Sequence, residues 1–328
     1  MPTIQEAIIE RTNHPAFGYF NPTDEYFDSI IRWQAKRNGV QGLTKECIGY
    51  ENGVLGGVVS TLRAYVQPGD AVLVHSPTYI GFTKSIEAAG YRIVHSPLKL
   101  DDQGVWRMDF EDMERKLAQN HIHVAVFCSP HNPCGRVWER DEIERAMDIY
   151  RQHDCVVISD EIWSDIILPG HKHIPTQSVS EDARMRTVAL YAPSKTFNLA
   201  GLVGSYHIIY NETLRDRVCA VSNKTHYNEM NAFRCTRLSV PTSRRATSGS
   251  MSSTRLSRAT LTTSAITWTS ILRVCPIHVR RARTWCFWTA PSGAESMAAI
   301  FSGCSTRGRA WAWGIRTAAR STDPATFA

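Results

Sequence analysis

Residues 187–198 read TVALYAPSKTFN. Residues 188–191 are apolar and predict a short buried strand. Lys195 follows that strand by four residues, inside the string Ser-Lys-Thr-Phe-Asn. A lysine just past a buried strand can reach an electrophile at the edge of a sheet, and its amine forms Schiff bases with carbonyl compounds. The stretch therefore predicts a reactive amine carried by an α/β scaffold.

Two apolar runs upstream also end in polar residues. Residues 156–159 (VVIS) are followed by Asp160, and residues 124–128 (VAVFC) are followed by Asn132 within the string SPHNPCG. In open α/β sheets, ligands collect at the carboxyl ends of the strands. Asn132, Asp160 and Lys195 are therefore predicted to meet at one edge of a sheet.

Short strand-like runs alternate with helical patterns over most of the first 210 residues. This alternation predicts an α/β fold, a three-layer αβα sandwich with a mainly parallel sheet. Residues 1–40 are predicted to form a helical N-terminal segment, and residues 41–231 the major domain. Strands are expected at 70–74, 92–94, 124–128, 156–159, 187–191 and 204–210, and helices at 24–37, 52–65, 79–89, 110–119 and 140–153.

The three polar residues match what pyridoxal phosphate (PLP) needs from its protein. Lys195 supplies the amine and then acts as general base at the substrate Cα. Asp160 supplies the acid that keeps the pyridine nitrogen protonated, and the Asn132 amide donates to the phenolic oxygen. Taken singly, a lysine is usually a solvated charge, an aspartate after a strand is often a helix cap, and Asn-Pro is an ordinary turn signal. The prediction of a PLP site rests on the occurrence of all three residues in this order, each after a predicted strand.

Further residues are candidates for holding the same cofactor. The turn Gly53-Val54-Leu55 directs helix N-terminal amides at an anion and is predicted to cradle the phosphate, and the Ser194 hydroxyl is expected to add a hydrogen bond there. Tyr79 is predicted to stack on the ring. Alone, a glycine-rich turn is common, and a tyrosine in this position is more typical of a core. No metal site is predicted.

Five strings carry a family resemblance: FGY (17–19), SPHNPCGRVW (129–138), ISDEIW (158–163), HIP (173–175) and SKTFNLAG (194–201). On these strings, residues 2–231 resemble the fold-type I PLP enzymes of the class I/II aminotransferase superfamily. Within it they look most like the cystathionine β-lyase (MalY/PatB)-type C–S lyases. The Asn-Pro-x-Gly and Ser-Lys strings are specific for the superfamily, whereas residues 135–138 and 160–163 favour the lyase branch.

The resemblance implies a homodimer with active sites at the subunit interface, where Tyr19 reaches the phosphate of the partner subunit. It also implies that the family's first segment is absent from this sequence. Two positions depart from the aminotransferase pattern. Trp163 stands where those enzymes often carry tyrosine, which leaves Asn132 as the main partner of the phenolic oxygen, and Val203 stands where they often carry a phosphate-binding arginine. Trp163 is nevertheless counted among the cofactor-contacting residues.

The activity implied by the resemblance is β-elimination of a thiol from a cysteine S-conjugate such as cystathionine, giving pyruvate and ammonia. An aminotransferase with the same cofactor site is the first alternative, and it would require a 2-oxo acid acceptor. A non-catalytic regulatory protein with this fold is the second. Its cellular function would survive the loss of Lys195.

The composition of the 328-residue chain is that of a globular protein, with 43% hydrophobic and 21% charged residues. No apolar run is long enough to cross a membrane, and no signal peptide is visible at the start. Nine cysteines without CxxC pairs favour free thiols in a reducing compartment. A cytoplasmic location without membrane or nucleic-acid partners is expected.

The last 96 residues differ from the rest of the chain. Residues 233–328 contain 14 Arg, no Lys, 29 Ser or Thr and only two acidic residues, and they have no sustained periodicity. A basic nucleic-acid-binding arm is one interpretation. A one-base shift of the reading frame near residues 231–234 explains them better, because in the shifted frame residues 247–272, 284–309 and 309–328 become family-like helix and strand segments. The small C-terminal domain is then lost or scrambled, and 232–328 are expected to be disordered or ill-defined.

Overall fold

The computed structural model of the chain describes residues 2–14, 16–224 and 228–230. The residues predicted to be out of frame, 232–328, lie outside this described part. In the described ranges, no helix combines the length and the apolar character needed to cross a bilayer. The division into an N-terminal segment, a major domain and a tail stays a prediction.

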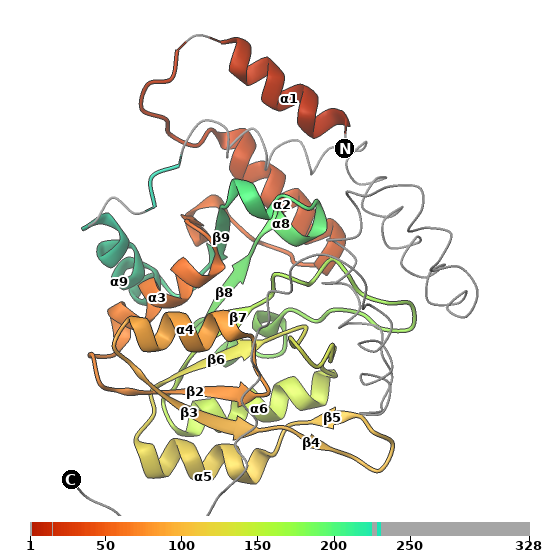
Figure 1. Ribbon diagram of the computed structural model, residues 1–328, viewed down its shortest axis with the longest axis vertical. Coiled ribbons are helices and arrows are strands. Elements are labelled where there is room, and N and C mark those ends of the chain that lie inside the picture. Colours follow the sequence, from red (N-terminus) through yellow and green to blue (C-terminus); the bar gives the residue numbers. More distant parts are fainter. Residues whose placement is uncertain (1, 15, 225–227, 231–328) are drawn as a thin grey trace, which may run out of the picture. The chain divides into compact units, whose positions relative to one another are not determined.

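A seven-stranded sheet runs through the described residues in the order β1-β9-β8-β7-β6-β2-β3 (Figure 1). The five strands from β8 to β3 are parallel to one another, and β9 is antiparallel to both of its neighbours. The expectation of a mainly parallel sheet is therefore confirmed. The strand bounds are β1 (Ile48–Glu51), β2 (Ala71–Ser76), β3 (Arg92–Pro97), β6 (Val124–Cys128), β7 (Val156–Asp160), β8 (Thr187–Tyr191) and β9 (Ser205–Ile208).

Helices cover both faces of the sheet, as predicted. On one face lie α3 (Val54–Tyr65), α4 (Ile80–Ala88) and α9 (Glu212–Asn223), and on the other α5 (Phe110–Asn120), α6 (Arg140–Gln152) and α7 (Glu181–Arg186). Alternate residues of β6 pack in the apolar clusters on the two faces of the sheet. Val124 and Val126 pack with α3, α4 and α9, and Ala125 and Phe127 pack with α5, α6 and α7. A strand buried on both faces reads as a continuous apolar run, which is why the sequence reveals it.

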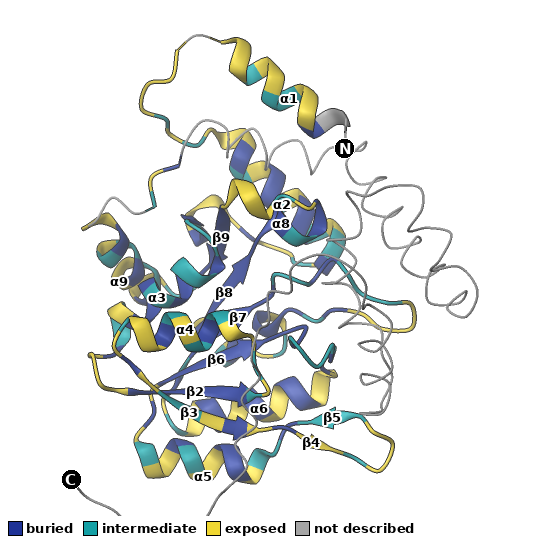
Figure 2. Cartoon of the chain, viewed as in Figure 1, coloured by how far each residue is buried: buried dark blue, intermediate teal, exposed yellow. Residues whose placement is uncertain are grey.

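The N-terminal helices α1 (Pro2–Asn13) and α2 (Asp24–Asn38) match the helical pattern of residues 1–40. Tyr26 and Ile30 of α2 are buried against β1, β8 and β9 in a third apolar cluster. Figure 2 shows that α2 carries buried positions. Trp33 of α2 packs in a smaller cluster with Ile4 of α1 and Phe197. Helix α2 thus packs on the side of the sheet formed by β1, β9 and β8, and α1 and α2 both pack in one cluster with Phe197, two residues after Lys195.

Several short elements are absent from the sequence-based prediction. They comprise the hairpin strands β4 (Lys99–Leu100) and β5 (Trp106–Arg107), the one-turn helix α8 (Pro193–Thr196) and the 3₁₀ turns η1 (Lys45–Cys47), η2 (Thr176–Ser178) and η3 (Ala200–Leu202). Elements of two to four residues span too little of a period to produce a pattern. The longer helices α7 and α9 are also absent from the sequence-based prediction.

The edge strand β1 is joined to β9 by a buried ion pair. Nδ1 of His207 lies 2.8 Å from a Glu51 carboxylate oxygen, and Nδ2 of Asn228 donates to the other oxygen at 3.0 Å. The His207 ring fills the space above Gly49, where a Cβ atom would lie 2.2 Å from it. The polar pair therefore fixes the register of β1, the strand that leads into the turn at Gly53.

Candidate functional site

The parallel strands β6, β7 and β8 lie side by side in the sheet (Figure 1). Three predicted site residues lie at or just after the carboxyl ends of these strands. Asp160 is the last residue of β7 and is paired in register with Cys128 of β6 and Leu190 of β8. Asn132 follows β6 in the next loop, and Lys195 follows β8 in α8. The topology brings these residues to one edge, as the sequence predicts.

Lys195 is held in the short turn of α8. The turn is closed by backbone hydrogen bonds from the Phe197 amide to Pro193 (3.0 Å) and from the Leu199 amide to the Ser194 carbonyl (2.8 Å). The Lys195 side chain is half-buried, and its Nζ lies 5.4 Å from the centroid of the Trp163 ring. The structure thus brings Trp163 against the predicted reactive amine, and the adjacent Ser194 is buried.

The Asp160 carboxyl is buried with little to stabilise its charge. Burial raises the pKa of Asp160 to about 7, although the Ile162 amide donates to Oδ1 at 3.0 Å and Lys195 lies near enough to oppose the shift. A buried carboxylate needs a cation or several donors to stay ionised. The Asp160 site can therefore bind a cationic N–H group, which would restore its negative charge.

The next residue, Glu161, has the opposite environment. Its carboxylate accepts from the Tyr191 hydroxyl (2.5 Å), lies 2.7 Å from His173 Nε2, and accepts from the Ser159 hydroxyl (2.9 Å) and the Thr176 amide (3.0 Å). Burial opposes its ionisation, but His173 and these donors hold the pKa of Glu161 below its ordinary value. Glu161 therefore has a structural role, joining β7 to β8 and to the 173–176 loop.

Sequence reasoning did not identify this network. The string HIP (173–175) contains the histidine of this network, but nothing local to it indicates the carboxylate partner. Its partner Glu161 is twelve residues away and Tyr191 is thirty residues beyond Glu161. Only the pairing of β7 with β8 places Glu161 and Tyr191 side by side.

The predicted phosphate cradle lies at the start of α3. Gly53 is the N-cap of α3 with a φ of +89°, a backbone conformation that other residues adopt only with strain. The amides of the first helical turn, including those of Val54 and Leu55, have no partner within the helix and can face an anion. Further along, Gly57 lets α3 approach β8, because a Cβ atom there would lie 2.6 Å from Leu190 Cδ2.

The loop after β2 lies against the Asn132 loop. His131 Nε2 is 2.9 Å from the Pro77 carbonyl, which connects the two loops. In the same loop, Thr78 Oγ1 is buried and has no hydrogen-bond partner among the described residues. Thr78 is thus a candidate site residue that sequence reasoning missed, and its unused hydroxyl is the only signal for it.

The two predicted tyrosines are not placed in the site by the described residues. Tyr79 is 38% exposed, and its ring packs edge-on against Phe82 at 5.5 Å and covers Gly81 at the start of α4. Tyr19 lies fully exposed between α1 and α2. Stacking by Tyr79 and the contact of Tyr19 with a partner subunit stay predictions.

Comparison with known proteins places this geometry in a family. The model of the aminotransferase class I and II family matches residues 1–251. Cystathionine beta-lyase PatB from Bacillus subtilis (strain 168) is 38% identical over 233 residues, which are 71% of this chain and 60% of PatB. The chain thus spans about 60% of the length of this curated relative.

Solved structures agree with this assignment. Cystalysin from Treponema denticola, whose structure contains a pyridoxal 5'-phosphate cofactor, superimposes with a TM-score of 0.76 at 28% identity, covering 84% of this chain and 68% of cystalysin. The PLP-bound C–S lyase from Staphylococcus hominis gives a TM-score of 0.75 at 27% identity, covering 81% and 67% of the two chains. With more than half of its length matched by the family model and the fold shared with these structures, the chain belongs to the aminotransferase class I and II family.

Proposed function

We propose that the chain binds PLP, with Lys195 as the amine to which the cofactor is attached. The observation that carries the proposal is the buried Asp160 carboxyl, whose pKa is raised to about 7 because nothing beside it fully compensates its charge. The protonated ring nitrogen of PLP is a cation of the required kind. The PLP in cystalysin and in the Staphylococcus hominis C–S lyase supports the same choice of cofactor.

The remaining contacts follow from the elements around Asp160. The first-turn amides of α3 at Val54 and Leu55 would hold the phosphate, together with the Ser194 hydroxyl. Gly53 would shape this turn rather than donate to the phosphate, because its amide already donates to the Glu51 carbonyl at 2.9 Å. Asn132 would donate to the phenolic oxygen. Trp163 would contact the cofactor beside the amine, and Tyr79 would turn from its position over α4 to stack on the ring. The unused Thr78 hydroxyl adds a further donor in the same loop.

We infer that the reaction is β-elimination from a cysteine S-conjugate such as cystathionine. When bound, PLP supplies the electron sink for the pair released at the substrate Cα. Lys195 takes the Cα proton as general base, and the thiol leaves from Cβ. With one water consumed, the remaining atoms leave as pyruvate and ammonia. The name of PatB and the PLP-bound C–S lyase support this choice.

An aminotransferase is the second candidate, favoured by the family model itself. Incubation with cystathionine separates the two activities. Release of thiol, pyruvate and ammonia without any 2-oxo acid indicates the lyase. Amino-group transfer that depends on an added 2-oxo acid, with no thiol released, would contradict the lyase proposal.

Cofactor attachment is tested by mixing the full chain with PLP, reducing with borohydride and locating the added mass on peptides. The PLP adduct is expected on the peptide that contains Lys195 and is expected to be lost in Lys195→Ala. Lys172→Ala, which removes an exposed lysine, is the matched control and should keep the adduct. Equal labelling of both lysines would contradict the proposal.

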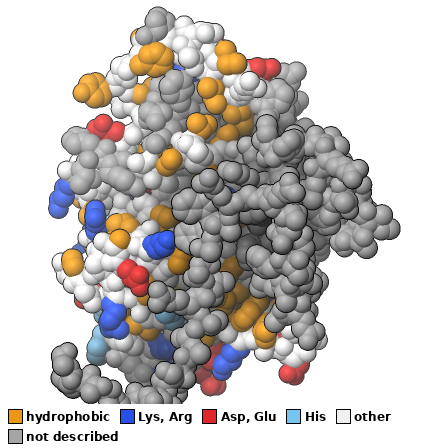
Figure 3. All heavy atoms as spheres, viewed as in Figure 1, with side chains coloured by type: hydrophobic (Ala, Val, Ile, Leu, Met, Phe, Trp, Pro, Cys, Tyr) orange, Lys and Arg blue, Asp and Glu red, His pale blue; other side chains and the backbone are white. Residues whose placement is uncertain are grey.

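We also propose that the protein acts as a homodimer, in which Tyr19 contacts the partner subunit. Several large apolar side chains are exposed, and Figure 3 shows hydrophobic side chains on one face of the described surface. The exposed residues include Phe17, Tyr19, Tyr79, Ile80, Leu202 and Val203. Exposed apolar surface can mark a protein contact when it forms a contiguous patch, and a dimer interface would bury side chains of this kind. Light scattering that gives the mass of one chain would contradict the dimer.

Two further proposals concern the chain as a whole. A reducing, cytoplasmic location is supported by the five cysteines of the described part, which are all free. The proposed frameshift is supported by the Arg- and Ser/Thr-rich composition of residues 233–328. Resequencing the gene across codons 231–234 tests it, since a single intact frame that encodes these residues as written would contradict it.

A further inference from the structure

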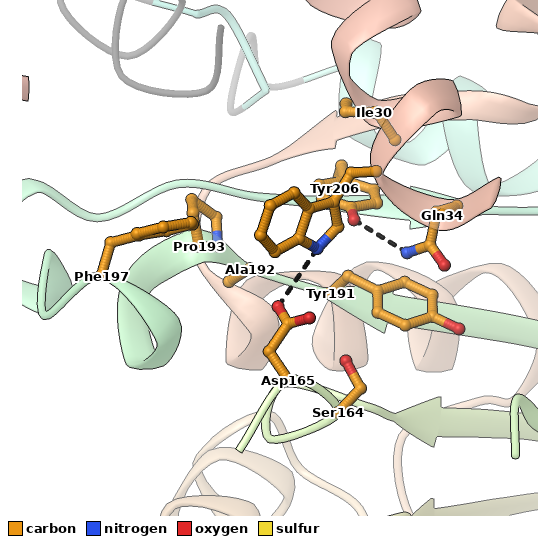
Figure 4. A pocket seen from close by; sticks show the side chains of 10 residues that line it. Ile30, Gln34, Ser164, Asp165, Tyr191, Ala192, Pro193, Phe197 and Tyr206 are labelled. Atoms are coloured by element: carbon orange, nitrogen blue, oxygen red, sulfur yellow. Dashed lines mark hydrogen bonds between the residues drawn. The ribbon is translucent and has the colours of Figure 1, made fainter. Parts of the chain in front are cut away.

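Asp165 joins three parts of the molecule that are distant in sequence. Its carboxylate accepts hydrogen bonds from Trp33 Nε1 (3.2 Å) and Thr196 Oγ1 (2.8 Å) on Oδ2, and from Arg37 Nε (3.1 Å) on Oδ1. Arg37 also donates to the Asp165 carbonyl at 3.1 Å. The side chain of Asp165 is only 8% exposed. It forms part of the wall of a small cavity with Pro193 and Phe197 (Figure 4).

The Thr196 contact bears on the site because Thr196 is the residue after Lys195. Helix α8 is a single turn of four residues, and a helix of that length has little stability of its own. The position of α8 therefore depends on side-chain contacts made by the two residues that follow the lysine. Thr196 provides one through Asp165, and Phe197 provides another by packing on Trp33 with ring centroids 5.5 Å apart.

Asp165 is also connected to Asp160, at the other half of the site. The chain between them is folded into successive turns, with backbone hydrogen bonds from Ser164 to Glu161 (3.0 Å) and from Ile166 to Trp163 (3.0 Å). These turns hold Asp165 at a defined position relative to the end of β7. The Asp165–Thr196 hydrogen bond thus ties the segment that carries Asp160 and Trp163 to the turn that carries Lys195.

We propose that Asp165 is a positioning residue, which fixes the Lys195 turn relative to Asp160 by accepting the hydrogen bond of Thr196. The inference rests on the proposed role of Lys195 in holding PLP. A purely structural role is the competing explanation, because Arg37 and Trp33 use the same carboxylate to anchor α2. Substitution of Thr196 distinguishes the two roles, because its hydroxyl contacts Asp165 but Thr196 is not part of α2.

Thr196→Val tests the proposal, since it keeps the shape of the side chain and removes the donor. Borohydride fixation of PLP at Lys195 is expected to be roughly tenfold slower, or to need roughly tenfold more PLP, because a hydrogen bond to a charged group is lost. Thr196→Ser retains the hydroxyl and should restore the native value within about twofold. Arg37→Gln removes the ion pair between α2 and Asp165 but leaves the Trp33 and Thr196 hydrogen bonds in place, and it should lower the melting temperature with a smaller effect on fixation.

A second measurement does not depend on PLP. Acetylation of the full chain by a small anhydride, followed by peptide mass analysis, compares the rates at Lys195 and at the exposed Lys172. In Thr196→Val the Lys195 rate should change several-fold while the Lys172 rate stays constant. Unchanged Lys195 acetylation would overturn the positioning role. Failure of the native chain to fix PLP at Lys195 would instead overturn the proposed function.

Discussion

Asp160 and Glu161 are neighbouring acids with opposite electrostatics. Glu161 is surrounded by donors and keeps its charge, whereas Asp160 is buried with one amide donor and has a pKa raised to about 7. The difference arises from the alternation of side chains along a strand end, which directs the two carboxyls to different surroundings. One acid stabilises the fold, and the other stays available to a ligand.

The Asp160 environment predicts a pH dependence of stability in the protein without cofactor. Because burial favours the protonated acid, the stabilisation is complete below the ordinary pKa of 3.8 and is lost as the pH rises to about 7. The loss amounts to roughly 4 kcal/mol. Denaturant titrations between pH 4 and 7 should show this decline, and Asp160→Asn should flatten it. Glu144→Gln, which changes a partly exposed acid, should leave the decline in place.

Substitution of Tyr191 should show how much its hydrogen bond to Glu161 contributes to the stability of the fold. Tyr191→Phe removes the hydroxyl that donates to Glu161 at 2.5 Å and leaves the packing of the ring. A lost hydrogen bond to a buried charge should lower the free energy of unfolding by about 1.5–3 kcal/mol. A urea titration should show a lower midpoint with an unchanged slope. An unchanged midpoint would mean that Glu161 does not depend on this donor.

At the scale of elements, α3 approaches β8 closely at Gly57. The close approach brings the N-terminus of α3 towards the strand end that carries Ser194 and Lys195. Two glycines serve different purposes here, since Gly53 permits a positive φ and Gly57 permits contact with Leu190. The position of the proposed anion-binding turn therefore depends on the packing of the helix behind it.

Gly57→Ala should disturb the contact between α3 and β8. The added methyl would lie 2.6 Å from Leu190 Cδ2, so either the side chain or the helix must move. Overpacking of this kind costs about 1–3 kcal/mol, measurable as a lower denaturation midpoint, and PLP affinity should fall with it. Gly18→Ala is the matched control, because nothing lies within 4 Å of the added atom. Equal effects of the two substitutions would contradict the role of Gly57.

The edge pair Glu51–His207 predicts a second pH dependence, at alkaline pH. Burial opposes protonation of His207, but Cys219 and Glu51 raise its pKa to about 9. The stabilisation is therefore complete below pH 6.5 and is lost as the pH rises to about 9, by roughly 3 kcal/mol. The free energy of unfolding of His207→Gln should be lower at pH 6 and nearly constant across this interval. A decline equal to that of the native chain would exclude His207 as its source.

At the scale of the whole molecule, cofactor binding and folding should be coupled. A ligand that binds only the folded chain raises the free energy of unfolding by about 2.7 kcal/mol at a concentration one hundred times its Kd. The melting temperature should therefore rise with PLP concentration. Asp160→Asn, which removes the charge proposed to face the ring nitrogen, should reduce the rise, whereas Glu144→Gln should not. A melting temperature independent of PLP would contradict the proposed cofactor.

The sequence predicts the parts of the fold that repeat a local pattern. The strand 124–128 is apolar throughout, and the helix that begins at 140 has a regular apolar stripe, so both are evident without coordinates. The pairing of Glu161 with Tyr191, or of Glu51 with His207, leaves no local signal, because the partners come from different strands. The same is true of Asp165, whose three side-chain donors lie on α2 and α8.

The antiparallel strand β9 lies between β1 and β8, so Gly53 and Ser194 leave the sheet at the same edge with one strand between them. Neighbouring strands are about 4.8 Å apart, which separates the ends of β1 and β8 by roughly 10 Å. The width of β9 therefore sets the length that a ligand needs in order to contact both the helix amides and the lysine amine. A ligand with its anion and its carbonyl too close together would reach only one of them.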